Sequence, residues 1–97
     1  MLNRIVKMHF REEAVEEFLT VFYRYKAAIA SQSGCQSVSL LQDHGQKNIF
    51  YTFSLWDSAE SLDKYRQSAL FQDVWPQTKK LFLEPAQAWS LYEKSSS

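Results

Sequence analysis

The sequence predicts an α+β domain in which four antiparallel strands form one sheet with helices on one face. Two kinds of segment predict it: those in which apolar and polar residues alternate, and those in which apolar residues recur every three or four positions. In addition, 97 residues contain only two glycines and two prolines, so most of the chain should lie in regular elements. A chain of this length supports one core, so we expect a single domain over residues 1–94 and a disordered tail at 95–97.

The first strand is expected over residues 2–10, because apolar and polar residues alternate there. The side chains that share one face of it are Val6, Met8 and Phe10. From residue 11 to about residue 32 the apolar period changes to that of a helix. Its apolar stripe consists of Val15, Phe18, Phe22, Tyr25 and Ile29. Gly34 then offers the positive φ that commonly ends a helix.

Two further strands are expected over residues 35–43 and 48–56, which are rich in β-branched and aromatic residues. The short, glycine-bearing segment between them is typical of a hairpin. The stretch Asp57–Glu60 then resembles a helix N-cap with a capping-box glutamate. We expect one helix to follow it and Ser68 to cap another that starts at Ala69.

The last part of the chain should contain the end of this helix and a fourth strand. Pro76 has no backbone N–H, so it should kink the helix or begin a new one. The fourth strand is expected over residues 86–93, directly after Pro85. The complete order is βαββαβ, which with right-handed crossovers closes as the ferredoxin-like arrangement.

Charge and hydropathy exclude several classes of function. Eleven basic and eleven acidic residues balance without a run of either sign, which argues against a nucleic-acid or anionic-membrane partner. No apolar stretch approaches the roughly 20 residues of a spanning helix, and the alternating start does not resemble a signal peptide. Cys35 is the single cysteine and the two histidines are far apart, so we expect no disulfide and no metal site. These features predict a cytoplasmic protein.

The sheet predicts a second copy of the chain. Both of its faces carry apolar side chains, since Tyr51 and Phe53 alternate with Phe50 and Trp56, and Trp89 lies on the fourth strand. Helices can cover only one of those faces. We therefore expect a homodimer that covers the other face, the alternative being a hydrated face with a few exposed aromatic residues.

Several segments together resemble the antibiotic biosynthesis monooxygenase (ABM) family. They are the strand MLNRIVKMHF, the glutamate-rich helix, the strand SGCQSVSLL and the pattern W-D-S-x-E-x-L-x-x-Y-x-x-S-x-x-F. The resemblance covers nearly the whole chain. It implies ferredoxin-like domains that pair into a dimeric α/β barrel, and an activity such as cofactor-independent quinol or anthrone oxygenation, or haem degradation. Other members of the family have no known activity.

The resemblance disfavours haem degradation and implies no cofactor. The haem-degrading branch uses a strand asparagine, a helix tryptophan and an iron-ligating histidine. These positions fall on Val6, Tyr65 and Trp75 here, so all three differ. The indole of Trp75 offers no lone pair to iron.

The resemblance also places a cavity between the sheet and the helices. Tyr65 and Trp75 would then line it and are the candidate catalytic residues. The full set of expected lining residues is Met8, Phe22, Tyr51, Tyr65, Phe71 and Trp75. The same side chains would equally fill a solid core, and the sequence leaves both possibilities open.

Two functions follow from these alternatives. The first is a cofactor-independent monooxygenase that acts on a small aromatic substrate such as a quinol or phenol. The second is a non-enzymatic dimeric module that binds a small apolar ligand or has only a structural role.

Overall fold

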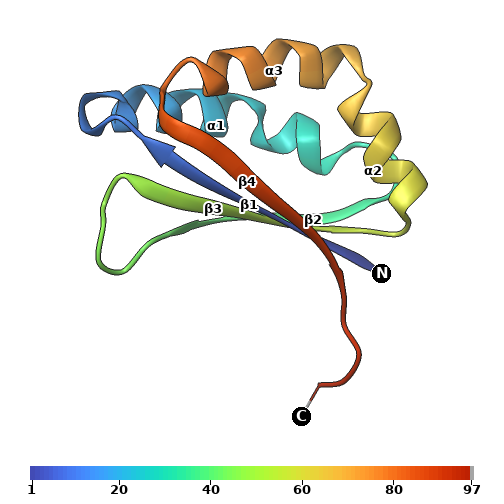
Figure 1. The fold of residues 1–97 in the computed structure, drawn as a ribbon. Helices are drawn as coiled ribbons and strands as arrows, with labels where there is room; N and C mark the ends of the chain where they lie inside the picture. Colours follow the sequence, from blue (N-terminus) through green and yellow to red (C-terminus); the bar gives the residue numbers. More distant parts are fainter. Residues whose placement is uncertain (97) are drawn as a thin grey trace.

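The computed structural model describes residues 1–96 as one antiparallel sheet covered by helices on a single face (Figure 1). The strands are β1 (Leu2–Phe10), β2 (Cys35–Gln42), β3 (Ile49–Trp56) and β4 (Phe82–Tyr92). The helices are the 3-10 turn η1 (Glu12–Ala14), α1 (Val15–Ala30), α2 (Ala59–Arg66) and α3 (Ala69–Lys79). The strand order β2-β3-β1-β4 confirms the predicted ferredoxin-like sheet. Of the predicted tail at 95–97, Ser97 lies outside the described residues.

The central strand β1 shows why the sheet has one buried face. It pairs antiparallel with β3 on one side and with β4 on the other. Met8 lies opposite Phe50 of β3, and both side chains point toward the helices and are buried. Lys7 lies opposite Tyr51, and this pair points away from the helices because successive residues of a strand alternate between faces.

The helix ends follow the capping residues, with one correction. Ser58 is the N-cap of α2, because its Oγ accepts a hydrogen bond of 3.1 Å from the backbone N–H of Ser61. Glu60 therefore lies at the second helical position, and the predicted capping-box role is wrong. Ser68 caps α3 as predicted, accepting from the N–H of Phe71 at 3.1 Å. Gly34 has the predicted positive φ, at 86°.

Both prolines lie inside regular elements, contrary to the predicted boundaries. Strand β4 begins at Phe82 and not after Pro85. An edge strand tolerates proline, and the pairing of β1 with β4 shifts register on either side of His9. Helix α3 also continues through Pro76, with Val74 and Thr78 buried on its inner side. Burial of residues on both sides of the proline holds the helix together across the missing hydrogen bond.

The hydrophobic core consists of two separate clusters between the sheet and the helices. The first cluster is made of Met8, Phe10, Ala14, Phe18, Phe22, Phe50 and Leu81. The second cluster is made of Leu2, Trp56 and Leu62, with Cys35 and Tyr65 packed against it. The two lie at opposite ends of the buried face, since Leu2 and Phe10 are the two ends of β1.

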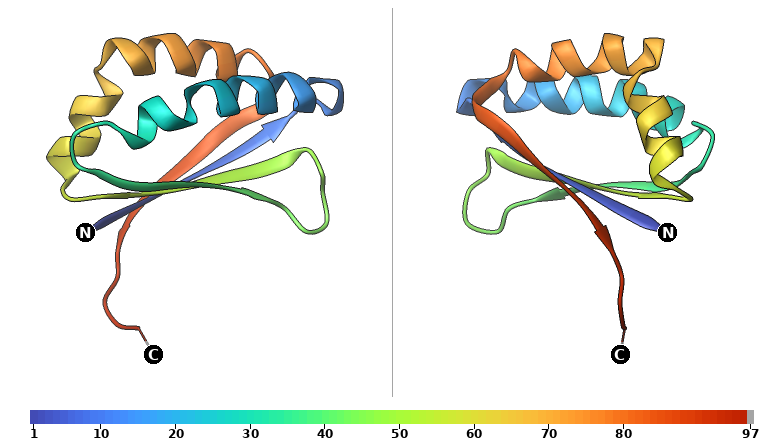
Figure 2. Two further views of the ribbon diagram at one scale, coloured as in Figure 1. Left: turned by 180° about the vertical axis from the view of Figure 1, so that it is seen from behind. Right: turned by 45° about the vertical axis from the view of Figure 1, so that its right-hand side comes forward.

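The outer face of the sheet has no helix over it, as the turned views show (Figure 2). Ile5 pairs with Phe53 on one side and with Trp89 on the other, which forms an apolar row across this face. Trp89 is 42 % exposed and Leu91 is 48 % exposed. None of the helices formed by residues 1–96 is long and apolar enough to cross a bilayer.

Candidate functional site

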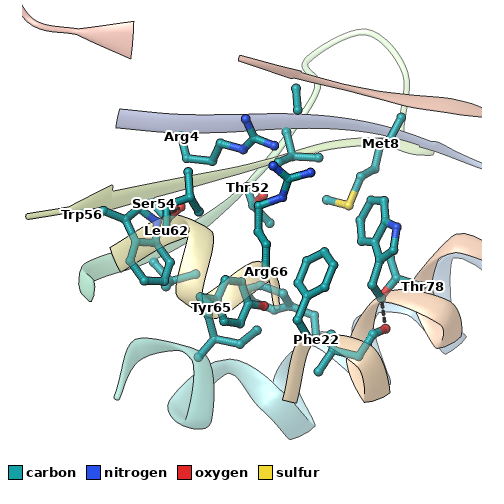
Figure 3. Close-up of a pocket in the computed structure, with 18 of the residues that line it drawn as sticks. Arg4, Met8, Phe22, Thr52, Ser54, Trp56, Leu62, Tyr65, Arg66 and Thr78 are labelled. Carbon is teal, nitrogen blue, oxygen red and sulfur yellow. Dashed lines mark hydrogen bonds between the residues drawn. The ribbon is translucent and has the colours of Figure 1, made fainter. Parts of the chain in front are cut away.

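A cavity of about 280 Å³ lies between the two core clusters, under α2 and α3 (Figure 3). It exists because the sheet carries small side chains at the middle of its buried face. Thr52 and Ser54 of β3 separate Phe50 from Trp56, and β4 contributes alanines. The sheet residues that line the cavity are Arg4, Val6, Met8, Val38, Thr52, Ser54, Trp56, Ala86 and Ala88. The space is a cavity and not a filled core, near the lower end of the roughly 300–1,000 Å³ of ligand sites.

Three aromatic rings from the helices form one wall of this cavity, which we call the aromatic wall: Tyr65, Phe71 and Trp75. The Tyr65 and Phe71 rings meet edge to face with centroids 5.3 Å apart. Phe71 and Trp75 are stacked at 5.8 Å, because residues four apart share a helix face. The wall is therefore a continuous apolar surface suited to a flat ring.

Five of the six predicted lining residues lie on the cavity. These are Met8, Phe22, Tyr65, Phe71 and Trp75. The prediction for Tyr51 is wrong, because strand alternation places it with Lys7 on the outer face of the sheet. Thr52, its neighbour in β3, takes the cavity position instead.

Trp56 closes the cavity at the second cluster. It is 1 % exposed and stacks on Tyr65 with ring centroids 5.3 Å apart. Its indole Nε1 donates a hydrogen bond of 2.9 Å to the Oγ of Ser54, which is also buried. Trp56 thus packs the corner between sheet and helix and holds the Tyr65 ring in place.

Tyr65 supplies a neutral phenol to the cavity. Burial raises the pKa of Tyr65 to about 12, with a smaller contribution from the nearby Cys35 thiol. The Tyr65 side chain lines the cavity, and its hydroxyl points toward it (Figure 3). A neutral tyrosine in this position can donate a hydrogen bond to an oxygen of a bound ligand.

Two arginines complete the lining, and neither is among the residues predicted from the sequence. Arg4 has the same strand parity as Met8 and so faces the helices, and Arg66 follows Leu62 by one helical turn. These two spacings are the sequence features from which the positions of Arg4 and Arg66 on the cavity could have been predicted. Figure 3 shows the two guanidinium groups directed toward one another. Burial lowers the pKa of Arg4, and the charge of Arg66 lowers it further, while Asp63 partly opposes both effects.

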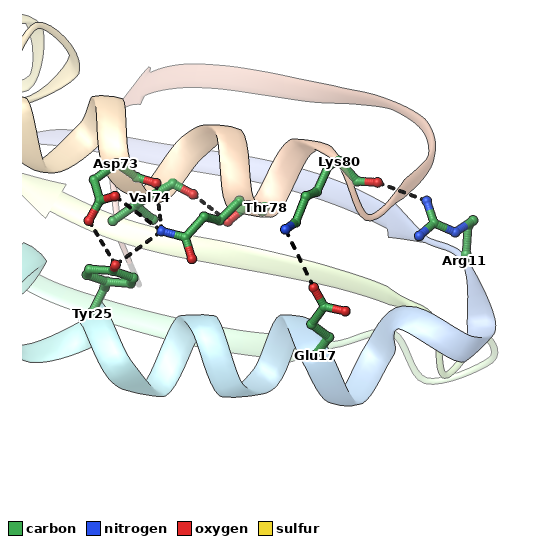
Figure 4. A network of polar contacts seen from close by, with 8 residues as sticks. Arg11, Glu17, Tyr25, Asp73, Val74, Thr78 and Lys80 are labelled. Carbon is green, nitrogen blue, oxygen red and sulfur yellow. Dashed lines mark hydrogen bonds and ion pairs between the residues drawn. The ribbon is translucent and has the colours of Figure 1, made fainter.

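Polar contacts outside the cavity hold α1 and α3 together above the sheet (Figure 4). The Tyr25 hydroxyl donates to a carboxylate oxygen of Asp73 at 2.8 Å and accepts from the amide of Gln77 at 3.1 Å. Lys80 lies 3.9 Å from a carboxylate oxygen of Glu17. These contacts fix the spacing of α1, which carries Phe22, and α3, which carries Phe71 and Trp75 of the aromatic wall.

Titratable groups that could bind a metal are scattered. Within residues 1–96, no three histidine, cysteine or acidic side chains gather closely enough to hold an ion. His9 lies on the outer face, 3.4 Å from Glu84. Cys35 is half-buried, and burial raises the pKa of its thiol, so it is a weak nucleophile at neutral pH.

Residues 1–76 match the family model described as "Antibiotic biosynthesis monooxygenase". The chain belongs to the antibiotic biosynthesis monooxygenase family. The match runs from β1 through most of α3 and therefore includes the aromatic wall and both arginines of this ABM protein. No curated protein sequence matches the chain.

Solved structures of similar proteins share the fold of this ABM protein at low sequence identity. A conserved protein from Methanosarcina mazei Go1 is 20 % identical with a TM-score of 0.90, covering 97 % of this chain and 94 % of that one. Rv0793 from Mycobacterium tuberculosis is 18 % identical with a TM-score of 0.89, covering 99 % and 97 %. A variant of SnoaB, described as a cofactor-independent oxygenase from Streptomyces nogalater, is 17 % identical with a TM-score of 0.87, covering 98 % and 94 %.

Proposed function

We propose that this ABM protein is a cofactor-independent monooxygenase that oxidises a small quinol or phenol in the cavity between sheet and helices. The observation that carries the proposal is the hollow bounded by stacked aromatic rings, in a protein with a packed core on either side of it. The description of SnoaB as a cofactor-independent oxygenase supports it.

The reaction needs no added reductant when the substrate is a quinol. One atom of dioxygen replaces a ring hydrogen, the other leaves as water, and the quinol becomes a hydroxyquinone. The quinol supplies all four electrons that dioxygen takes up. The tasks left to the protein are to exclude water, hold the ring and stabilise the substrate anion that reacts with oxygen.

The residues of the cavity divide these tasks. Phe71 and Trp75 offer stacked surfaces to the substrate ring. Tyr65 remains protonated because of its raised pKa, so it can donate a hydrogen bond to a substrate oxygen. The second cluster behind Trp56 closes the cavity against water at that end.

A second candidate function is a dimeric module that binds a ligand without chemistry. One observation favours it: the lining within residues 1–96 contains no carboxylate, imidazole or amine that could act as a general base. An oxygenase built on this cavity must therefore act on a substrate whose proton is readily lost.

We also propose that a second copy of the chain covers the outer face of the sheet. The row formed by Phe53, Ile5 and Trp89 gives that face an apolar centre. Two such faces packed together would remove these side chains from water.

Oxygen uptake with a panel of quinols and phenols tests the activity. Saturable uptake that survives a chelator and is lost on heat denaturation would support the monooxygenase. The double variant Tyr65→Phe/Trp75→Ala should lower the rate at least tenfold. Tyr23→Phe is the matched control, because Tyr23 is 66 % exposed. Absence of uptake above the autoxidation control across the panel would favour the binding module.

A further inference from the structure

We propose that the cavity selects an aromatic ligand carrying an oxyanion, and that Arg4 and Arg66 hold this oxyanion while the aromatic wall holds the ring. The inference rests on the same cavity as the proposed function and names the chemical class that it takes. It rests on the placement of two cationic groups in an otherwise uncharged, mainly apolar lining.

The fold places both arginines on the cavity lining. Arg4 is half-buried on the helix-facing side of β1, and its Nη1 donates a hydrogen bond of 3.0 Å to the Oγ of Ser90. Arg66 ends α2 directly after Tyr65 and is exposed. An exposed lining residue places the positive charge where a ligand would enter from water.

The two charges have no carboxylate partner. Within residues 1–96, the ion pairs join His9 with Glu84, Arg11 with Glu13 and Lys80 with Glu17, all away from this cavity. Asp63 is near enough to influence Arg4 but forms no ion pair with it. Two guanidinium groups directed toward one another repel, and a bound oxyanion would remove that repulsion while accepting hydrogen bonds from both.

The two arginines could also promote ionisation of the substrate, although the described lining residues include no general base. A phenol bound beside two guanidinium groups loses its proton more readily, since nearby positive charge favours the anion. A ring carboxylate would use the same contacts without ionising in the cavity. The shared chemistry is an oxyanion on an aromatic ring, from either source.

Binding of three naphthalene probes to the full chain tests the inference without any turnover. 2-Naphthoate should bind at least tenfold more tightly than naphthalene-2-carboxamide, its neutral isostere. Naphthoate tests recognition of a ring carboxylate, and 2-naphthol tests recognition of a phenolate. The absorbance of 2-naphthol shows whether it ionises at lower pH when it is bound. Quenching of tryptophan fluorescence follows binding, because Trp75 and Trp56 line the cavity.

Variants assign the effect to the arginines. Arg66→Gln and Arg4→Gln should each reduce naphthoate affinity about tenfold and leave carboxamide affinity within twofold. Arg24→Gln, which removes an exposed arginine outside the cavity, is the matched control and should change neither. Because Arg66 is exposed, its variant should fold normally, which thermal unfolding checks, and it decides the matter if Arg4→Gln does not fold.

The inference is overturned if the carboxamide binds as tightly as naphthoate, if Arg66→Gln behaves like Arg24→Gln, or if none of the probes binds. Its failure is distinct from failure of the proposed function. Selective naphthoate binding without oxygen uptake on any quinol would retain the anion site and reject the oxygenase. Oxygen uptake with no preference for the anionic probe would retain the oxygenase and reject the anion site.

Discussion

Side-chain size at a few sheet positions determines where the core is solid and where it is hollow. Phe50 and Trp56 fill the two ends of the buried face of β3, and the smaller Thr52 and Ser54 lie between them. Ala88 of β4 also lines the hollow and pairs with Val6 across the sheet. A larger apolar residue at one of these positions should fill the space.

Ala88→Leu should therefore block binding without loss of stability. We expect naphthoate affinity to fall at least tenfold, while the free energy of unfolding stays within about 1 kcal/mol of the parent protein. Gln87→Leu is the control, since residue 87 pairs with Lys7 and faces away from the cavity. Equal binding by Ala88→Leu and the parent protein would show that the ligand lies elsewhere. Fluorescence titration and urea unfolding measure the two quantities.

Tyr65 should make the free energy of unfolding decrease at alkaline pH. Its pKa is raised by burial to about 12 in the folded state, against 10.0 for an unperturbed tyrosine, so folding favours the protonated phenol. This contribution is complete below pH 10 and is lost as the pH rises toward 12. The loss should be at most about 3 kcal/mol, and Tyr65→Phe should not show it. Urea unfolding of both proteins between pH 9 and pH 12, with Tyr23→Phe as control, tests this by difference.

Gly34 joins α1 to β2 with a backbone conformation that is strained for any residue with a Cβ atom. Its φ is 86°, and a Cβ built there would overlap the hydroxyl of Ser61 in α2. Gly34→Ala should lower the free energy of unfolding by at least about 2 kcal/mol. Gly45→Ala is the matched control, because an added Cβ there meets Asp43 at an ordinary 3.6 Å. Similar urea midpoints for the two variants would contradict this account.

At the scale of the elements, sequence patterns predict the bounds of three strands well, and they fail where a proline lies inside an element. Alternation in residues 2–10, and the β-branched and aromatic residues of 35–43 and 48–56, predict β1, β2 and β3 to within one residue of their observed ends. The predicted start of β4 after Pro85 is four residues late, because an edge strand can contain a proline and β4 begins at Phe82. Tertiary packing likewise keeps α3 continuous through Pro76.

The candidate site was predicted in part for similar reasons. Helical spacing placed Phe71 and Trp75 on one face, and the structure brings both to the cavity. Tyr51 was assigned to the wrong face of its strand. Arg4 and Arg66 are absent from the predicted lining, and most charged side chains of a domain this size are solvated. Which cationic side chains border a cavity depends on where the cavity lies, and that depends on the packing of all four strands.

Pro76→Ala should stabilise the protein, because alanine restores a backbone donor within α3 and removes the ring from the helix interior. The gain should be about 1–2 kcal/mol, since part of the effect is offset by the greater freedom of the unfolded chain. Pro85→Ala in the edge strand is the control and should change stability by less than about 0.5 kcal/mol. A loss of stability in Pro76→Ala would show that the proline ring itself is needed for packing.

At the scale of the whole molecule, the sheet has one covered and one uncovered face (Figure 2). The uncovered face presents Trp89 and Leu91, both exposed in the protomer, beside Phe53 and Ile5. Its apolar centre is the part of the molecule that a second copy would bury.

Light scattering after size exclusion should give a mass of twice 11.4 kDa at micromolar concentration. Trp89→Lys should weaken the dimer at least tenfold, because a lysine there would be buried without a partner. Tyr23→Lys, on the exposed side of α1, should leave the mass unchanged. A parent protein of 11.4 kDa would reject the dimer, and circular dichroism checks that both variants fold.

The separation of the core into two clusters has a consequence for how such proteins diverge. The buried clusters that hold the sheet to the helices lie at the two ends of the buried face. Met8, Phe22 and Trp56 belong to these clusters and also line the cavity, whereas Thr52, Ser54 and Ala88 line it without belonging to either cluster. Substitutions in the middle can therefore alter ligand preference while the fold persists, because they leave both ends intact. We therefore expect homologues to conserve residue size in the two clusters, and to vary most at the lining positions that belong to neither cluster.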